Sequence, residues 1–500
     1  MATTTSNLVS AKLPRGIDAV TPFIDGGRVS AADPKTVRTF NPSSGEALLQ
    51  IPTGSVIDVQ RAVESARKVF RDGRWSQLPP SKKEATLARF AALIKKEAAT
   101  LDALDALEMG KPVGLKAFNA EGAAGHVEFF AGAINKVLGA VLPSDSRSFV
   151  TQIHVPRGVI AAIVPWNFPT FNAILKIAPA LAAGNSVVLK PSELSSLSAL
   201  RLAELAVEAG VPEGVLNVVP GLGETVGRAL GLHSDVDMVA FTGSTAVGKL
   251  MLQYSGSSNM KVVLAECGGK SPQIVFNDGV DTDSVAASIA QSILTNQGQV
   301  CSTGSRVLVH QSIEEEILTK VLANMRTIKV GDALDDATTF GPLVTRQQLE
   351  KVHSYVEAGK SSGAKLAYGA SDAGRSGSGY FVTPTVFANV PPQARIAQEE
   401  IFGPVLSFIS FSSEEEAIRI ANDTMYGLAA FVWTRNLATG LRFAKSVQAG
   451  LVCVNACAIT GEGAGHGISI EPYGQSGVGT ESGLAGMESY LRRQLVWFNH

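Results

Sequence analysis

The chain is poor in several residue types, and each shortage excludes a class of protein. It has 4 cysteines in 500 residues, too few for a disulfide framework, so we expect a reducing compartment, namely the cytoplasm. Aromatic residues make up only 6%, which argues against a surface that stacks sugars or single-stranded bases. A net charge of −2 leaves no basic excess, so no nucleic-acid partner is expected.

Long apolar runs are also lacking. The longest are 159–165 and 177–189, both shorter than the ~18 residues that a membrane span needs, and polar residues and a proline interrupt the second. Residues 1–16 hold no apolar run of signal-peptide length. Because 45% of the residues are hydrophobic and 18% are charged, wholesale disorder is excluded. We therefore expect a globular protein of two or three domains that does not enter a membrane.

Short apolar runs that alternate with helical patterns dominate the rest of the chain. From residue 159, strands are predicted at 159–164, 186–189, 215–219 and 238–241, with helices between them. A second series of the same kind extends from about 262 to 454. This alternation predicts two doubly wound α/β domains with parallel sheets.

Two further patterns lie outside those series. Ser81 and Glu84 have the spacing of a capping box, and apolar residues at helical spacing continue to Leu107, which predicts one long helix. Residues 147–155 alternate as a strand, and the apolar tail 490–498 needs a partner strand. That partner is either the earlier segment or another subunit.

Two residues have the chemistry of a catalytic pair. Cys301 lies on a connection between a predicted helix and a predicted strand, among glycines and polar residues, where an ionised thiol could act as a nucleophile. Glu266 follows the apolar run 262–265 and precedes two glycines, and it could act as a general base. The alternatives are a small buried cysteine and a carboxylate that faces solvent.

Glycine-rich turns predict a nucleotide site. The segments 221–227 and 243–248 each follow a predicted strand and open a helix, so either helix N-terminus could bind a pyrophosphate. The segment 190–193, Lys-Pro-Ser-Glu, ends a strand, where open α/β sheets bind their ligands. A carboxylate at that position can accept hydrogen bonds from both hydroxyls of a ribose.

Taken together, the chain resembles the aldehyde dehydrogenase superfamily from about residue 20 to the end. The matching segments are Pro165-Trp-Asn-Phe-Pro169, Lys190-Pro-Ser-Glu193, Phe241-Thr-Gly-Ser-Thr245, Glu266-Cys-Gly-Gly-Lys270, Gly298-Gln-Val-Cys301 and Glu399-Glu-Ile-Phe-Gly-Pro404. The resemblance implies two doubly wound α/β domains and a small β oligomerisation module, in a homodimer or homotetramer. The implied parts are an NAD-binding domain (1–141 and 159–265), a catalytic domain (266–480) and the module (142–158 and 481–500).

The resemblance also implies a role for individual residues. Cys301 would be the nucleophile, Asn167 the side-chain donor to an oxyanion, and Glu266 the base that activates the hydrolytic water. The residues implied to bind NAD are Trp166, Lys190, Glu193, Gly223, Gly243, Ser244, Glu400 and Phe402. The carboxylate of Glu193 favours NAD over NADP, since it would repel a 2′-phosphate. The residues implied to line an aldehyde tunnel are Phe168, Asn172, Leu175, Cys457 and Thr460.

The substrate is predicted less closely. Many relatives carry larger side chains in the tunnel, so we expect a medium-sized or ring-bearing polar aldehyde or semialdehyde to be preferred over acetaldehyde. An ω-amino or γ-glutamylamino aldehyde is the alternative, suggested by the segment 258–261. Against it, Asn119 and Gly122 stand where some aminoaldehyde enzymes place acids.

Two other functions would keep the same fold. Acyl transfer to coenzyme A is disfavoured by the presence of Glu266, and a non-catalytic cofactor-binding protein is disfavoured by the complete set of Cys301, Glu266 and Asn167. The sequence departs from the family at Cys267, where Leu is usual, and at 472–477, which is shorter and lacks a Lys. Cys453 and Cys457 have no His or Cys cluster beside them, so no metal site is expected.

Overall fold

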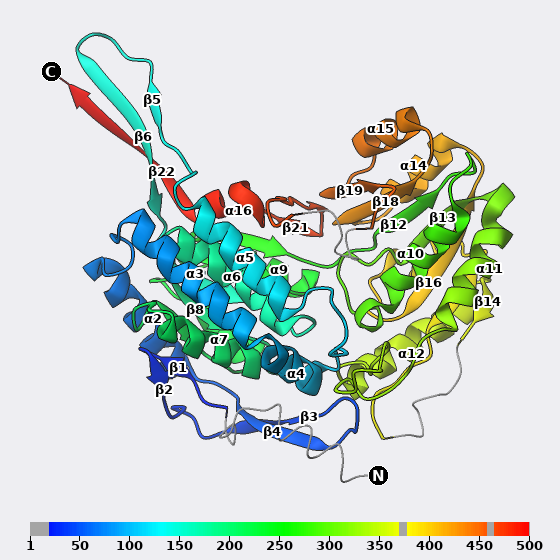
Figure 1. Cartoon of the computed structure of the whole chain (residues 1–500), viewed down its shortest axis with the longest axis horizontal. Coiled ribbons are helices and arrows are strands. Elements are labelled where there is room, and N and C mark those ends of the chain that lie inside the picture. The colour runs from blue at the N-terminus through cyan, green and yellow to red at the C-terminus, as the bar shows by residue number, and fades with distance from the viewer. Residues whose placement is uncertain (1–19, 370–377, 458–464, 500) are drawn as a thin grey trace.

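The computed structural model describes residues 20–369, 378–457 and 465–499. Two large sheets lie side by side, each covered by helices, and a three-stranded arm projects from one end of the molecule (Figure 1). Over the described ranges, no helix has both the length and the apolar composition needed to span a bilayer.

The first sheet has eight strands and is parallel in its centre. In spatial order they are β2 (Gly27–Arg28), β1 (Phe23–Ile24), β9 (Leu216–Val218), β8 (Ser186–Lys190), β7 (Val159–Ile163), β10 (Met238–Thr242), β11 (Val262–Glu266) and β21 (Gly477–Val478). The strands β9, β8, β7, β10 and β11 run parallel, whereas β1 and β21 are antiparallel to their neighbours. Every residue of β7 and β8 is buried, which explains why both read as continuous apolar runs in the sequence.

The second sheet has seven strands. In spatial order they are β14 (Lys365–Tyr368), β15 (Thr385–Ala388), β16 (Val405–Phe411), β13 (Arg306–His310), β12 (Pro272–Val275), β18 (Ala429–Trp433) and β19 (Leu451–Val454). All of them run parallel except β14. The prediction of two doubly wound α/β units is thus confirmed. The residue limits given above for the three domains stay a prediction, and β21, from the late part of the chain, adds to the first sheet.

The arm is a three-stranded antiparallel sheet of β5 (Ala140–Leu142), β6 (Ser148–Pro156) and β22 (Leu491–Asn499) (Figure 1). β22 pairs with β6 along its whole length, from Leu491 opposite Pro156 to Asn499 opposite Ser148. The two unassigned strands of the sequence therefore pair within one chain. Two smaller sheets join β3 (Thr36–Phe40) to β4 (Ala47–Pro52) and β17 (Tyr426–Gly427) to β20 (Tyr473–Gly474).

Helices cover both faces of each large sheet. They are α2 (Val56–Asp72), α3 (Pro80–Lys96), α4 (Ala98–Met109), α5 (Ala120–Ala133), α6 (Pro169–Ala182), α7 (Leu197–Glu208), α8 (Arg228–Leu232), α9 (Thr245–Gly256), α10 (Thr282–Leu294), α11 (Glu314–Met325), α12 (Arg346–Ser361), α13 (Arg395–Gln398), α14 (Glu414–Asn422), α15 (Leu437–Ser446) and α16 (Gly483–Ser489). Along β7, Ile160 and Ala162 pack into one core and Val159, Ala161 and Ile163 into another, because successive side chains of a strand point to opposite faces.

The predicted capping box at Ser81 is wrong. Helix α3 begins at Pro80, and no side chain caps it, because Pro79 occupies the capping position and has no side-chain acceptor. The single long helix predicted to continue to Leu107 is also divided. α3 ends at Lys96, Glu97 leaves the helical conformation, and α4 starts at Ala98.

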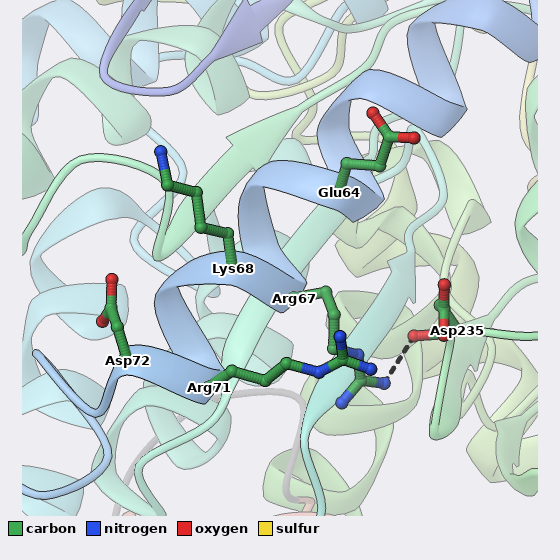
Figure 2. A pocket seen from close by; sticks show the side chains of 6 residues that line it. All are labelled: Glu64, Arg67, Lys68, Arg71, Asp72 and Asp235. Atoms are coloured by element: carbon green, nitrogen blue, oxygen red, sulfur yellow. Dashed lines mark hydrogen bonds between the residues drawn. The ribbon is translucent and has the colours of Figure 1, made fainter.

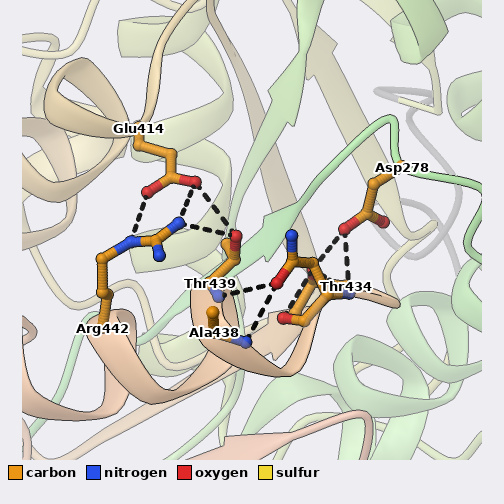
Figure 3. Close-up of polar contacts among 7 residues, drawn as sticks. Asp278, Glu414, Thr434, Ala438, Thr439 and Arg442 are labelled. Carbon is orange, nitrogen blue, oxygen red and sulfur yellow. Dashed lines mark hydrogen bonds and ion pairs between the residues drawn. The ribbon is translucent and has the colours of Figure 1, made fainter.

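Polar contacts fix the helices that cover the second sheet (Figure 3). Asn436 caps α15, because its side-chain oxygen accepts from the backbone N–H of Ala438 at 2.9 Å. Arg442 on the same helix donates to both oxygens of Glu414 on α14, at 3.0 and 2.8 Å. The Thr434 hydroxyl at the end of β18 donates to Asp278, which follows β12. These contacts tie α14 and α15 to the strands beneath them.

Candidate active site

Four parallel strands of the first sheet end beside one another at the edge where the predicted site residues lie. Ile163 is in register with Lys190 across β7 and β8, and Thr242 is in register with Glu266 across β10 and β11. Asn167 comes shortly after β7 in the chain. Ligands of open α/β sheets bind at the carboxyl ends of the strands, so the sheet places these segments where a ligand is expected.

Asn167 connects this edge to the loop that carries Cys301. The Nδ2 of Asn167 donates to the Gln299 backbone carbonyl at 2.9 Å. The backbone carbonyl of Asn167 accepts from Nδ2 of Asn296 at 2.8 Å. Asn172, one turn along α6, donates to Asn167 Oδ1 at 3.1 Å and so fixes which way the amide faces. A side-chain amide has two N–H groups, so the second one of Asn167 stays available to a ligand.

The loop before Cys301 is strained. Asn296 and Gln297 have φ values of 47° and 57°, in the left-handed region that costs a side chain about 1–3 kcal/mol. At Gly298, with φ 71°, an added Cβ would lie 2.5 Å from the Gly403 carbonyl oxygen. Such strain persists only where the surroundings enforce it, and here the loop is packed tightly against the segment after Glu400.

Cys301 is partly exposed. Burial by the surrounding protein, together with the negative charges of Glu400 and Glu266, raises the pKa of Cys301 to about 12. The thiol is therefore neutral in this state at pH 7. A base or a nearby positive charge must be present before Cys301 becomes a thiolate.

Glu266 is buried at the end of β11, with 8% of its surface exposed. Its Oε1 makes no hydrogen bond to the part of the protein that the structure describes. Burial raises the pKa of Glu266 well above its usual value, the Glu481 carboxylate raises it further, and the Lys176 ammonium group lowers it. A buried acid with a raised pKa and a free oxygen is well suited to hold a water molecule and take its proton.

Lys176 and Glu481 were not singled out in the sequence. Lys176 lies on α6 with a fully buried side chain, and it forms an ion pair with Glu481 just before α16. The available signal was a lysine inside an otherwise apolar helix, since lysine is almost never fully buried without a partner.

The residues predicted to bind the adenosine half and the pyrophosphate of NAD lie around the ends of β8, β9 and β10. Lys190 is buried, and its Nζ lies 3.4 Å from Glu193 Oε2. Ser244 caps α9, with its hydroxyl oxygen accepting from the Val247 N–H at 3.4 Å. Gly223 starts a short π-helix, and an added Cβ there would meet no atom within 4 Å. Gly243 donates its N–H to the Glu266 carbonyl at 3.0 Å, which joins this region to the base.

The residues predicted to bind the nicotinamide half of NAD come from both large units. Glu400 Oε1 accepts from the Gly269 N–H at 3.1 Å, just after β11. Burial raises the pKa of Glu400, and the Gly269 hydrogen bond lowers it. Phe402, whose φ is 58°, packs its ring against Trp166 edge to face, with the ring centroids 5.3 Å apart. All eight predicted cofactor residues thus lie near the strand ends of the first sheet or on the loop that contacts them.

Several ring side chains contact one another in succession, beginning with Phe168, the residue after Asn167, and we refer to them as the aromatic row. Successive ring centroids are 4.7, 5.0, 4.9 and 4.4 Å apart. The members, in spatial order, are Phe168, Phe118, Phe171, His126 and His466. Only Phe168 was predicted from the sequence. The others were missed because they come from three segments that the fold alone brings together.

The other predicted tunnel residues are spread around this row. Leu175 is half-buried one turn after Phe171 on α6, and Cys457 is buried in a core against which Phe118 packs. Asn172 is engaged with Asn167, as described above. Thr460 lies outside the described residues. The tunnel-lining role of these four residues stays a prediction.

The segment in which the chain departs from its relatives docks beside Glu266. Gly477 is in register with Glu266 across β21 and β11, and Ser476 is buried. The Ser476 hydroxyl donates to the Gly268 carbonyl at 2.7 Å and accepts from the Gly427 N–H at 2.9 Å. Ser476 therefore joins the segment just after β11, the strand that carries Glu266, to β17.

A charged surface hollow lies elsewhere, on α2 (Figure 2). It has a volume of about 550 Å³, and it is lined by Glu64, Arg67, Lys68, Arg71, Asp72 and Asp235. Arg67 donates to the Asp235 carbonyl at 2.6 Å, so part of the hollow's charge is already engaged. None of the predicted site residues lines it. Within the described ranges, no group of three or more His, Cys, Asp or Glu side chains is arranged to hold a metal ion.

Comparison with known proteins gives one consistent result. The family model "Aldehyde dehydrogenase family" matches residues 29–496. The NADP/NAD-dependent aldehyde dehydrogenase PuuC of Escherichia coli K12 is 43% identical over 481 residues, which are 95% of each chain.

Two solved structures are also very similar to the chain. An indole-3-acetaldehyde dehydrogenase complexed with NAD+ has a TM-score of 0.95 and 44% identity, with 99% of each chain covered. The γ-glutamyl-γ-aminobutyraldehyde dehydrogenase of Burkholderia cenocepacia J2315 has a TM-score of 0.94 and 44% identity, with 99% of this chain and 98% of that chain covered. The resemblance inferred from the six motifs is confirmed: the chain belongs to the aldehyde dehydrogenase family.

Proposed function

We propose that the chain catalyses the NAD-dependent oxidation of an aldehyde to a carboxylic acid, with Cys301 as nucleophile, Asn167 as oxyanion donor and Glu266 as base. The observation that carries this proposal is the junction between the two large units. Asn167 is hydrogen-bonded to the backbone two residues before Cys301, and the Glu266 and Glu400 carboxylates lie close enough to raise the pKa of the Cys301 thiol.

The predicted cofactor residues offer the chemistry that NAD needs. Glu193 and Glu400 are carboxylates, which accept hydrogen bonds from ribose hydroxyls, and Lys190 is a donor beside the first of them. Near them, the N-terminus of α9 presents backbone N–H groups for a pyrophosphate. The open space at Gly223 permits close approach to the backbone. NAD+, when bound, supplies a hydride acceptor.

Capture of the aldehyde requires the Cys301 proton to leave. Cys301 is partly exposed, so solvent can accept this proton once a positive charge near the thiol lowers its pKa, and Glu266 keeps its unpaired Oε1 for the later reaction with water. The thiolate adds to the carbonyl carbon, and the oxygen becomes an oxyanion. The free N–H of Asn167 and the backbone N–H of Cys301 would donate to that oxyanion, and one such donor typically lowers a barrier by about 3 kcal/mol.

Loss of hydride from this adduct leaves a thioester on Cys301. Glu266 then takes a proton from water, and the resulting hydroxide attacks the thioester carbonyl. The carbon–sulfur bond breaks, the carboxylate leaves, and Cys301 is restored as a thiolate or thiol. Lys176 and Glu481 contact no reacting atom in this scheme, and they set the pKa of Glu266 through their charges.

For the substrate, the structure favours a ring-bearing or medium-sized polar aldehyde. The aromatic row offers flat apolar surfaces that a ring can contact, and aromatic pairs are worth ~0.5–1.5 kcal/mol beyond their buried area. The named relatives act on indole-3-acetaldehyde and on γ-glutamyl-γ-aminobutyraldehyde, so an ω-amino or γ-glutamylamino aldehyde stays the alternative.

The arm supports a further part of the proposal, that the protein is a homodimer or homotetramer. β22 lies at the edge of its sheet, and it exposes Leu495, Trp497 and Phe498 by 64, 71 and 54%. An exposed apolar edge strand is a ready partner for another chain. The cytoplasm stays the proposed location, on the basis of the cysteine usage given above.

Measurement of NADH absorbance tests the function. The full-length protein is mixed with NAD+ and a panel of aldehydes, with and without coenzyme A. We expect NADH and a free acid at a rate that coenzyme A does not change. A strict requirement for coenzyme A would favour the acylating alternative, and no NADH with any aldehyde would refute the proposal.

A further inference from the structure

Two histidines terminate the aromatic row, and they contact each other. The rings of His126 on α5 and His466 lie edge to face with centroids 4.4 Å apart, and His126 also contacts Phe171 at 4.9 Å. The position of His466 depends on a glycine of α5, because a Cβ added at Gly125 would overlap the His466 ring. The fold thus places two imidazoles at the end of the aromatic row opposite Phe168, which follows the proposed oxyanion donor in the chain.

Both imidazoles are neutral at pH 7. Burial lowers the pKa of His126 to about 4, with the His466 ring contributing and the nearby Gly122 backbone opposing. Burial also lowers the pKa of His466. The charged groups nearest His466 are Glu128 and Lys95, which pair with each other at 2.6 Å. A neutral imidazole offers one N–H donor and one acceptor nitrogen but no charge.

His126 also has hydrogen-bonding capacity to spare. Its side chain is 8% exposed, and its Nδ1 makes no well-formed hydrogen bond. Neither of the two positions where some relatives place an acid, 119 and 122, carries an acid in this chain. Asn119 uses its Oδ1 to accept from the Gly122 N–H at 2.9 Å as the cap of α5, and Gly122 has no side chain. A buried polar atom without a partner costs about 1–3 kcal/mol, so a ligand that supplies the partner gains affinity.

We propose that His126 and His466 recognise the end of the substrate remote from the aldehyde, and that they select an uncharged hydrogen-bonding group over an ammonium group. The inference rests on the proposed aldehyde oxidation and adds a substrate class to it. Phe171 precedes Asn172, whose side-chain amide donates to Asn167, and the His126 ring packs against Phe171 with the ring centroids 4.9 Å apart. A flat ring can therefore contact the phenylalanines while a polar substituent on it reaches the histidines.

Three substituted phenylacetaldehydes test this directly. Their para substituents are ethyl, acetamidomethyl and trimethylammoniomethyl, which are apolar, polar but uncharged, and permanently cationic. For the unmodified protein we expect kcat/KM to be highest for the acetamidomethyl compound and lowest for the cationic one. His126→Phe keeps an aromatic ring but removes the nitrogens. It should lower kcat/KM for the acetamidomethyl compound about two- to tenfold and leave the ethyl compound within about twofold.

Two further variants keep the test decisive. Gly125→Ala should displace His466, and His466→Phe should remove its nitrogens. Like His126→Phe, both should lower the ratio of kcat/KM for the acetamidomethyl compound to kcat/KM for the ethyl compound. Glu462→Gln changes an acid four residues before His466 in the sequence and should leave the ratio unchanged.

Several results would contradict the proposal that His126 and His466 recognise the substrate. The cationic compound could be the best substrate, as expected if the row bound cations through its π faces. The ratio could also be unchanged in all three histidine-directed variants, or it could change only in Glu462→Gln. If the ethyl compound is still oxidised in these cases, only the recognition fails. If no aldehyde is oxidised, the proposed function fails with it.

Discussion

The buried ammonium group of Lys176 forms an ion pair with Glu481, a residue that follows it by 305 positions in the chain. The two charges act on the pKa of Glu266 in opposite directions, Glu481 raising it and Lys176 lowering it. Because the Lys176 side chain is fully buried and that of Glu481 is only 11% exposed, little solvent screens either effect. The pair therefore sets the pH range in which Glu266 can act as a base.

Replacing each member of this pair should move the pH profile of kcat in opposite directions. Glu266 must be ionised to take a proton from water, so the acidic limb of the profile follows its pKa. Lys176→Met removes a charge that lowers this pKa, and the limb should move about one pH unit or more upward. Glu481→Gln removes a charge that raises it, and the limb should move downward. The control is Lys95→Met, which breaks an exposed ion pair with Glu128. Shifts of both variants in the same direction would contradict the account.

Cys301→Ala should abolish aldehyde oxidation and leave NAD+ binding intact. No other cysteine lies on the loop held by Asn167. Cys267→Ala and Cys453→Ala serve as matched controls, and both should keep substantial activity. Cys267 is buried, with 5% of its surface exposed, whereas Cys301 is partly exposed, so the Cys301 thiol is the one open to an aldehyde. Loss of all turnover in Cys267→Ala, with Cys301→Ala still active, would reverse the assignment.

Glu193→Gln should relax the preference for NAD over NADP. The carboxylate lies 3.4 Å from Lys190 Nζ and is 36% exposed, so its repulsion of a 2′-phosphate is partly screened. We expect the ratio of kcat/KM for NADP to that for NAD to rise about tenfold. Glu224→Gln, on the neighbouring turn, is the control and should change the ratio little. If the unmodified protein uses NAD and NADP equally well, the proposed preference for NAD is wrong.

The stability of the fold should fall as the pH rises toward 8. Glu108 is buried, and burial raises its pKa to about 8, although it accepts hydrogen bonds from the Ser196 and Leu197 N–H groups at 3.0 and 2.9 Å. The folded protein thus keeps a proton that the unfolded chain loses near pH 4.5. The free energy of unfolding therefore decreases as the pH rises from about 4.5 to about 8 and levels off above that.

Urea unfolding at a series of pH values checks this prediction. The decrease should reach a few kcal/mol, since each pKa unit corresponds to about 1.4 kcal/mol. Glu108→Gln keeps one hydrogen-bond acceptor and removes the titration, so its stability should vary less with pH over that window. A slope as steep in Glu108→Gln as in the unmodified protein would assign the effect to other groups, such as Asp105, whose pKa burial raises to about 6.

The sequence predicted those features that lie within one segment. The buried parallel strands β7 and β8 read as apolar runs, and motifs at their ends placed Asn167, Lys190 and Glu193 at one edge of the sheet. Contacts between distant segments were not predictable in this way. The His126–His466 contact joins residues far apart in the chain, and no local pattern marks it. The capping box failed because the helix starts at Pro80, which puts Pro79, a residue without a side-chain acceptor, at the capping position.

Glu266→Gln gives the most direct test of the covalent mechanism. Hydride transfer needs no base acting on water, whereas hydrolysis of the thioester does. We expect one equivalent of NADH in a rapid burst, then slow turnover, and mass spectrometry should find the acyl group on the peptide that contains Cys301. Steady turnover close to that of the unmodified protein, or an acyl group on Cys267 and none on Cys301, would contradict the proposed roles of both residues.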